Sequence, residues 1–126
     1  NKSDFIEPVI PETIAKSIAI GNPADGLNSV NLVNKTNGTG TSVSESEIIQ
    51  GIRLLAETEG IFTETAGGVV IASLIKLSRQ NKLPSDEKTV CLITGNGLKT
   101  PDVVSNIKTF DIDSKSSNLD EILSKV

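Results

Sequence analysis

A short apolar run followed directly by Gly-Asn-Gly limits the folds that this chain can adopt more than any other feature. Residues 89–94 read Thr-Val-Cys-Leu-Ile-Thr, and Gly95-Asn96-Gly97 follows without a break. A nearly continuous run of β-favouring residues is typical of a central parallel strand that is buried on both faces. Ligands bind beyond the carboxyl ends of such strands, so the Thr94 hydroxyl and the Gly95 backbone are candidate ligand contacts. From these residues alone, a simple turn without function remains the alternative.

Helical patterns precede this strand, and their order predicts an α/β fold with a parallel sheet. Pro11 suits a first helical turn and predicts a helix through residue 20, which Gly21-Asn22-Pro23 would end. Ser44 and Glu47 have capping-box spacing, so a second helix should run from there to about residues 59–60.

The remaining segments give weaker signals. Residues 69–77 are apolar on most sides and predict a buried helix. Residues 26–40 are rich in Gly and Asn and predict loop and turn, with room for a strand or a short helix in the middle. A turn is expected at residues 84–88. Two short apolar stretches, at 107–112 and 119–123, lie in the C-terminal tail.

Composition excludes several classes of function. The net charge is −4 and aromatic residues make up 2% of the chain, so neither a basic phosphate-binding face nor base-stacking side chains are expected. Nucleic acid is therefore not an expected partner. The sequence contains neither a membrane-spanning apolar segment nor a signal peptide, which makes the cytoplasm the expected compartment. The single cysteine, Cys91, has no histidine to activate it and is interpreted as a core residue.

Glu64 is a second candidate site residue. It stands just before Gly67-Gly68 and the apolar helix pattern, where a carboxylate is stabilised by the helix dipole without any further role. A partly buried carboxylate at this position could also reach a ligand. Gly67-Gly68 lacks the third glycine and the lysine of a phosphate-binding loop.

Four segments, in order, resemble the C-terminal half of threonine synthase, a pyridoxal-phosphate enzyme. They are residues 11–15 leading to Ile20-Gly21-Asn22-Pro23, residues 44–47 with 55–62, residues 64–68, and residues 90–99. The most specific is Thr-Gly-Asn-Gly-Leu-Lys at 94–99, which is close to a family signature. The resemblance implies the tryptophan synthase beta-like fold (fold type II), in which residues 1–126 would form part of a three-layer domain with a parallel sheet.

The resemblance also implies roles for individual residues. Thr94 matches the position whose hydroxyl hydrogen-bonds the pyridine nitrogen of pyridoxal 5'-phosphate, with Gly95 beside it. Gly21 and Asn22 correspond to a loop that borders the cofactor, and Glu64 to an acidic position near the ring. Two positions depart from the family: Glu64 is followed by Thr65 where Pro is commoner, and Asn96 stands where His is often found.

The family's Schiff-base lysine and its phosphate-binding loop lie in the N-terminal half, and no segment here matches either. Lys99 and the other lysines lack the required context and are not assigned that role. The chain contains no Met and opens on Asn1, so we expect the C-terminal part of a longer enzyme. The complete enzyme would convert O-phosphohomoserine and water to threonine and phosphate. The segment alone would be inactive and would associate with itself or with the N-terminal half.

Two alternatives remain open from sequence. A related type II enzyme such as a threonine dehydratase would share the fold but would not need a phosphate leaving group. A binding or regulatory module could keep the fold without catalysis, and it would have to be stable alone.

Overall fold

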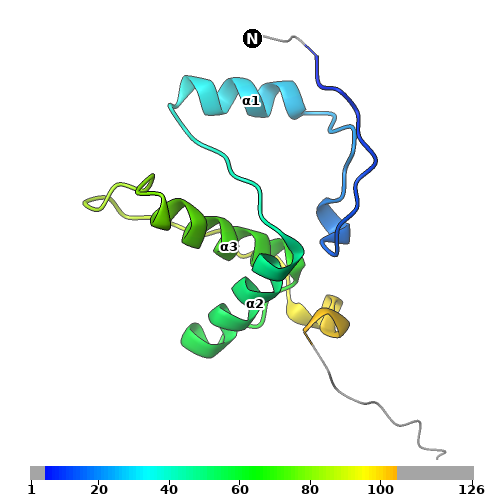
Figure 1. Cartoon of the computed structure of the whole chain (residues 1–126), viewed down its shortest axis with the longest axis vertical. Coiled ribbons are helices and arrows are strands. Elements are labelled where there is room, and N and C mark those ends of the chain that lie inside the picture. The colour runs from blue at the N-terminus through cyan, green and yellow to red at the C-terminus, as the bar shows by residue number, and fades with distance from the viewer. Residues whose placement is uncertain (1–4, 105–126) are drawn as a thin grey trace, which may run out of the picture.

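The computed structural model describes residues 5–104. Within that range three α-helices and three short 3-10 helices form: η1 (Lys16–Ile18), α1 (Gly26–Lys35), α2 (Glu45–Glu59), α3 (Thr65–Arg79), η2 (Gly97–Lys99) and η3 (Pro101–Val103). Helix α2 packs against α3, while α1 lies apart from them at the end of an extended connection (Figure 1). No helix in residues 5–104 is long and apolar enough to cross a membrane.

Helix α2 begins and ends where the sequence predicts. The Ser44 hydroxyl accepts a hydrogen bond from the Glu47 amide at 3.3 Å, and the Glu47 carboxylate accepts one from the Ser44 amide at 2.6 Å. This capping box satisfies two amides that the first helical turn leaves without partners. At the other end Gly60 takes a left-handed conformation with φ of 68°, which a glycine adopts without strain.

Glycines allow α2 and α3 to approach closely. A Cβ built on Gly51 would lie 2.6 Å from the Gly68 carbonyl oxygen, and one built on Gly68 would lie 2.7 Å from the Ile48 carbonyl oxygen. Neither position has room for a side chain. Ile48 and Ile52 are buried beside this contact and form the core together with Ala15 from the N-terminal segment.

Helix α3 contains the predicted helical segment 69–77 and begins four residues before it, at Thr65. Helix α1 falls in the segment for which the sequence left loop, strand or short helix open. Asp25 precedes its first residue, and the Asp25 carboxylate accepts a hydrogen bond from the Asn28 amide group at 2.6 Å. This bond joins two side chains, and the Asp25 carboxylate accepts no hydrogen bond from a backbone amide of the first turn of α1.

The predicted helix over residues 11–20 is wrong, because only the single turn η1 forms there. Two backbone amides that a helix would need are engaged otherwise. The Ala15 amide donates to the Thr13 hydroxyl at 3.1 Å, and the Ile14 amide donates to the Glu45 carboxylate at 2.8 Å. Local hydroxyl contacts of this kind compete with helix formation, and the β-branched side chains of the segment lower its helix propensity.

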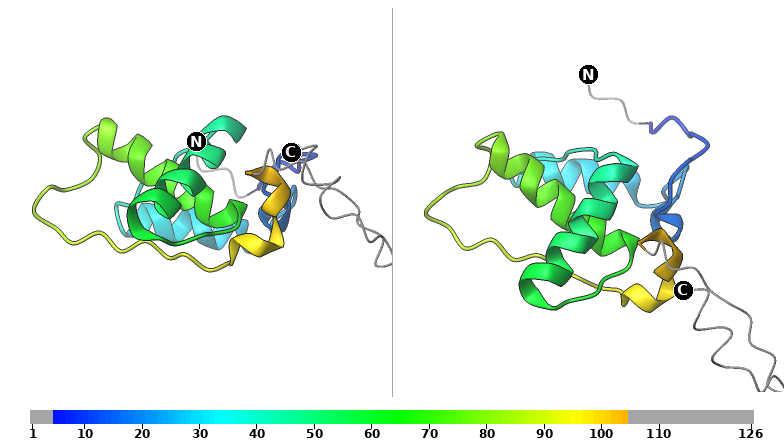
Figure 2. Two further views of the ribbon diagram at one scale, coloured as in Figure 1. Left: turned by 90° about the horizontal axis from the view of Figure 1, so that it is seen from below. Right: turned by 60° about the horizontal axis from the view of Figure 1, so that its bottom comes forward.

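The predicted parallel sheet is not confirmed. Residues 89–94 are extended and run back along α3 (Figure 2), but they belong to no strand ladder in the described range. Val90 and Leu92 are 80% and 72% exposed, and Cys91, expected in the core, is half-buried. A parallel strand is stabilised by neighbours far away in sequence, and residues 5–104 provide none. The apolar stretches at 107–112 and 119–123 lie outside the described residues.

Candidate functional site

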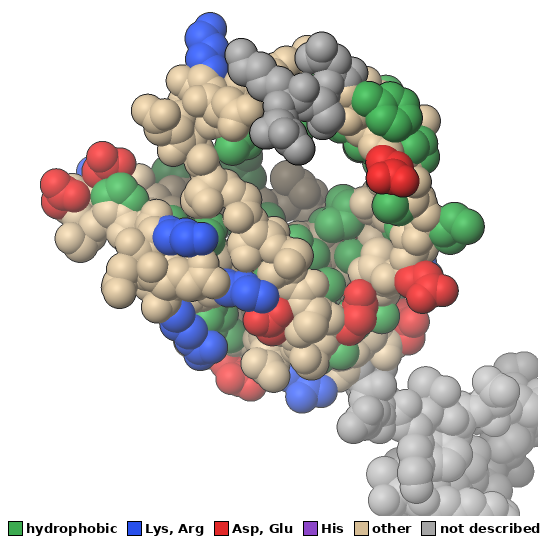
Figure 3. All heavy atoms as spheres, turned by 45° about the horizontal axis from the view of Figure 1, so that its top comes forward, with side chains coloured by type: hydrophobic (Ala, Val, Ile, Leu, Met, Phe, Trp, Pro, Cys, Tyr) green, Lys and Arg blue, Asp and Glu red, His purple; other side chains and the backbone are tan. Residues whose placement is uncertain are grey.

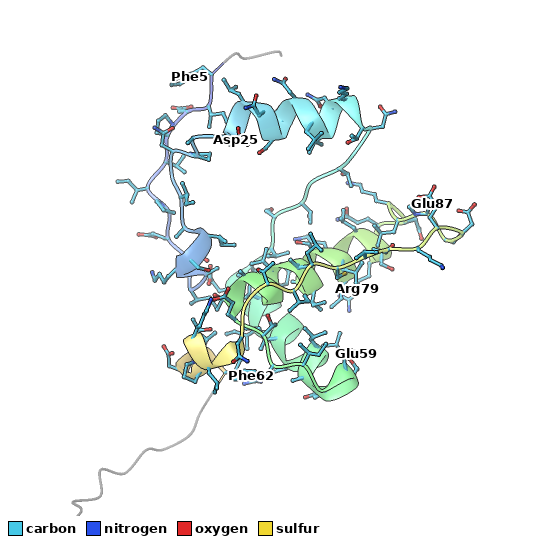
Figure 4. All side chains as sticks on the ribbon, turned by 180° about the vertical axis from the view of Figure 1, so that it is seen from behind. Phe5, Asp25, Glu59, Phe62, Arg79 and Glu87 are labelled. Atoms are coloured by element: carbon cyan, nitrogen blue, oxygen red, sulfur yellow. The ribbon has the colours of Figure 1, made fainter. Side chains whose placement is uncertain are left out.

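The predicted strand end meets the start of α3. The Glu64 amide and the Thr63 hydroxyl both donate to the Gly95 carbonyl oxygen, at 3.1 and 3.0 Å. The Gly97 amide donates to the Phe62 carbonyl oxygen at 3.0 Å. These bonds hold two segments about thirty residues apart against each other, and Figure 4 shows Phe62 beside the η2 turn. An isolated antiparallel bridge joins Thr63 to Asn96 within this contact.

The Glu64 carboxylate lies inside this junction. Glu64 precedes the first residue of α3 and is only 7% exposed. Its carboxylate packs on the backbone of Gly95, so closely that a Cβ at position 95 would overlap it. The positive end of the α3 dipole stabilises a negative charge here, and Lys99 forms an ion pair with it, Nζ to Oε2, at 3.8 Å.

Thr94 lies next to this junction and is exposed. Within residues 5–104 its hydroxyl makes no hydrogen bond. The structure therefore packs the buried Glu64 carboxylate against Gly95, the residue that follows the exposed Thr94 in the sequence.

Gly21 and Asn22 are held elsewhere. The Val9 amide donates to the Gly21 carbonyl oxygen at 3.0 Å. Asn22 is exposed and lines a hollow of about 170 Å³ together with Phe5 and Ile6. Among the described residues no hydrogen bond or ion pair joins Gly21 or Asn22 to the Glu64 junction.

A groove between α2 and α3 contains none of the predicted site residues. It has a volume of about 550 Å³ and is lined by polar and charged side chains such as Arg53 and Arg79, together with Leu54 and Ile75. None of the residues that line this groove belongs to residues 62–64 or 94–99.

Three residues of the junction escaped sequence reasoning. Thr63 and Phe62 lie in a short connector between two predicted helices, and the sequence assigns no role to Lys99. The local signal for Lys99 is the Asn96-Gly97 turn, which bends the chain back on itself directly after the strand-like run. No local pattern indicates that residues 62–64 contact residues 95–97.

The profile of the family described as "Pyridoxal-phosphate dependent enzyme" matches residues 2–95 of the chain. The chain belongs to this pyridoxal-phosphate dependent enzyme family. The matched range includes Gly21, Asn22, Glu64, Thr94 and Gly95, and Lys99 lies just beyond it.

Individual members of the pyridoxal-phosphate dependent family are similar over most of the chain. The chain is 40% identical over 112 residues to threonine synthase of Bacillus sp. (strain ULM1), covering 89% of the chain and 32% of that protein. It is 41% identical over 99 residues to threonine synthase of Methanocaldococcus jannaschii, covering 79% and 24%. It is 40% identical over 92 residues to threonine synthase of Synechocystis sp., covering 73% and 24%. The chain thus spans about a quarter to a third of these relatives.

The geometry at Thr94 suits the cofactor of this pyridoxal-phosphate dependent family. A pyridine ring presents one hydrogen-bond acceptor on its edge, and the exposed Thr94 hydroxyl can donate to it. Glycine at position 95, directly after Thr94 in the sequence, leaves room for the Glu64 carboxylate. The chemistry of the exposed Thr94 hydroxyl is therefore compatible with one edge of the cofactor.

Proposed function

We propose that the chain is the C-terminal part of a threonine synthase that converts O-phosphohomoserine and water to threonine and phosphate. The observation that carries the proposal is the packing of the buried Glu64 carboxylate against Gly95, directly after Thr94, whose exposed hydroxyl makes no hydrogen bond within residues 5–104. It lies in a segment shared with threonine synthases at about 40% identity.

In this proposal the chain supplies one wall of the cofactor site. When bound, pyridoxal phosphate supplies an electron sink that stabilises negative charge on the substrate carbon. Thr94 donates a hydrogen bond to the ring nitrogen, and being neutral it leaves that nitrogen unprotonated, whereas a carboxylate would hold a proton there. The Glu64 carboxylate stands near the ring, and Gly21 and Asn22 border the cofactor from a separate loop.

The remaining parts of the site would come from sequence outside this chain. The relatives are about three times as long as this chain, since the matched 112 and 99 residues cover only 32% and 24% of their length. We propose that an N-terminal half carries the Schiff-base lysine and the phosphate-binding loop. Strands of the complete domain would also pair with residues 89–94, whose exposed Val90 and Leu92 indicate a missing neighbour. Threonine formation by residues 1–126 alone, with cofactor added, would contradict the proposal that the Schiff-base lysine and the phosphate-binding loop lie outside this chain.

The experiment that tests the proposal compares substrates on the complete protein. O-phosphohomoserine should yield threonine and inorganic phosphate in equal amounts, and only with pyridoxal phosphate present. A protein that instead consumes threonine and ignores O-phosphohomoserine would be a dehydratase. Cofactor binding without turnover of either compound would favour a binding module.

A further inference from the structure

Lys99 is the cation of the Glu64 junction, and nothing above gives it a function. Its Nζ lies 3.8 Å from Glu64 Oε2. In residues 5–104 this is the one ion pair that Glu64 makes, and no hydrogen bond reaches its carboxylate oxygens. Within the described residues, Lys99 is therefore the one charged group that can act on the position of this carboxylate beyond its packing against Gly95.

The backbone places Lys99 with several bonds. The Asn96 side chain accepts from the Leu98 amide at 2.9 Å, and the Asn96 carbonyl oxygen accepts from the Lys99 amide at 3.2 Å. The bond from the Gly97 amide to Phe62 ties the same turn to the connector before α3. As a result the turn that begins at the strand end returns the Lys99 side chain toward Glu64.

The two partners are buried very differently. The Glu64 side chain is 9% exposed, whereas that of Lys99 is 64% exposed. A buried carboxylate without a partner is costly, so it gains from even one cation. The Lys99 side chain is long enough to remain mostly in water while its terminal amine lies near the Glu64 carboxylate.

We propose that Lys99 is a positioning residue, which holds the Glu64 carboxylate against Gly95 and away from the edge where Thr94 meets the cofactor. This inference rests on the proposed function, since it assumes a cofactor ring beside Thr94. Lys99 does not touch the cofactor itself and forms no bond with it. Its effect on the cofactor passes through the position of the Glu64 charge.

The test is a double-mutant cycle on the complete protein, with the dissociation constant and visible spectrum of pyridoxal phosphate as readouts. Lys99→Gln should weaken cofactor binding about threefold, the size expected for a solvent-screened ion pair, and should alter the spectrum. Lys99→Arg keeps the charge and should restore both. Lys82→Gln, at an exposed lysine beyond α3, is the matched control and should change neither.

The cycle is closed with Glu64→Gln. In that background Lys99→Gln should have no further effect, because the charge that it holds is gone. An equal effect in both backgrounds, or none in either, would overturn the inference while leaving the proposed function intact. If the unsubstituted protein binds no pyridoxal phosphate, the proposed function and the inference both fall. Melting temperatures of the cofactor-free variants identify any loss of cofactor binding that is due to unfolding. If Lys99→Gln unfolds, cofactor binding by Lys99→Arg, which keeps the charge, decides whether the inference holds.

Discussion

The Glu64 carboxylate occupies the space into which a side chain at position 95 would project. The three atoms nearest to a Cβ built on Gly95 all belong to the Glu64 side chain. The same two residues are joined by a backbone hydrogen bond of 3.1 Å from the Glu64 amide to the Gly95 carbonyl oxygen. The buried position of Glu64 therefore requires a residue without a side chain at position 95.

This arrangement predicts that Gly95→Ala displaces the Glu64 side chain. Overpacking a tight site costs about 1–3 kcal/mol, and urea denaturation of the complete protein should show a loss of that order. Gly40→Ala is the matched control, because a Cβ there meets nothing within 4 Å. In a Glu64→Ala background, Gly95→Ala should cost much less. An equal cost in both backgrounds would refute the packing relationship.

The α2–α3 contact gives a second stability prediction. A Cβ on Gly68 would lie 2.6 Å from Ile52 Cγ1 as well as close to the Ile48 carbonyl oxygen. Backbone cannot move aside as a flexible side chain can, so Gly68→Ala should lower the free energy of unfolding by about 1–3 kcal/mol. Urea denaturation checks it, again beside Gly40→Ala. A Gly68→Ala protein as stable as the control would show that the helices do not pack this closely.

The capping box predicts a pH dependence. Hydrogen bonds from the Ser44 amide and hydroxyl, with a smaller contribution from the Lys76 amine, lower the pKa of Glu47 below its usual value of 4.5. A carboxyl whose pKa is lower in the folded state stabilises the fold above its unfolded pKa. That stabilisation is lost as the pH falls from about 4.5 through the lower folded-state pKa.

Glu47→Gln should therefore be less stable than the unsubstituted protein at pH 7, and the difference should shrink below pH 4.5. Thermal unfolding over a pH series measures it. Glu57→Gln neutralises an exposed carboxylate on the same helix that caps nothing and serves as the control. A Glu47→Gln deficit that persists unchanged into acid would contradict the assignment of the stabilisation to the Glu47 charge.

The helices that could be predicted are those whose signals are local. Ser44 and Glu47 lie within one helical turn of each other, so four residues are enough to predict the start of α2. Gly60 likewise predicts its end. The Glu64 position at the start of α3 could be found in the same way. The helix predicted after Pro11 does not form, and the Ile14 amide donates instead to the Glu45 carboxylate, 31 positions away, a contact that no local pattern predicts.

The sheet and the site depend on longer distances. The composition of residues 89–94 identifies a strand, but pairing needs partners that the described residues do not contain. The Thr94–Glu64 junction could be anticipated only through the family resemblance, because no local pattern relates residues 62–64 to residues 95–97. The ion pair of Lys99 cannot be predicted for the same reason, because its partner Glu64 lies 35 positions earlier in the sequence.

Exposed apolar residues predict how residues 1–126 behave when produced alone. Val90, Leu92 and Ile10 are 80%, 72% and 93% exposed, and hydrophobic side chains lie open around a hollow in one face (Figure 3). The unpaired extended segment adds hydrogen-bonding groups that another chain can pair with. Sedimentation velocity should show self-association that Val90→Lys with Leu92→Lys reduces. A monodisperse monomer of the unsubstituted chain would contradict this prediction.

The most direct test of the account is a pyridoxal phosphate titration of the complete protein with Thr94→Val and Thr94→Ser. Losing a hydrogen bond between neutral groups should weaken cofactor binding about two- to tenfold in Thr94→Val. Thr94→Ser keeps the hydroxyl and should bind as the unsubstituted protein does. If Thr94→Val binds the cofactor as tightly and with the same spectrum, then Thr94 does not meet the ring nitrogen, and the cofactor wall assigned to this chain is wrong.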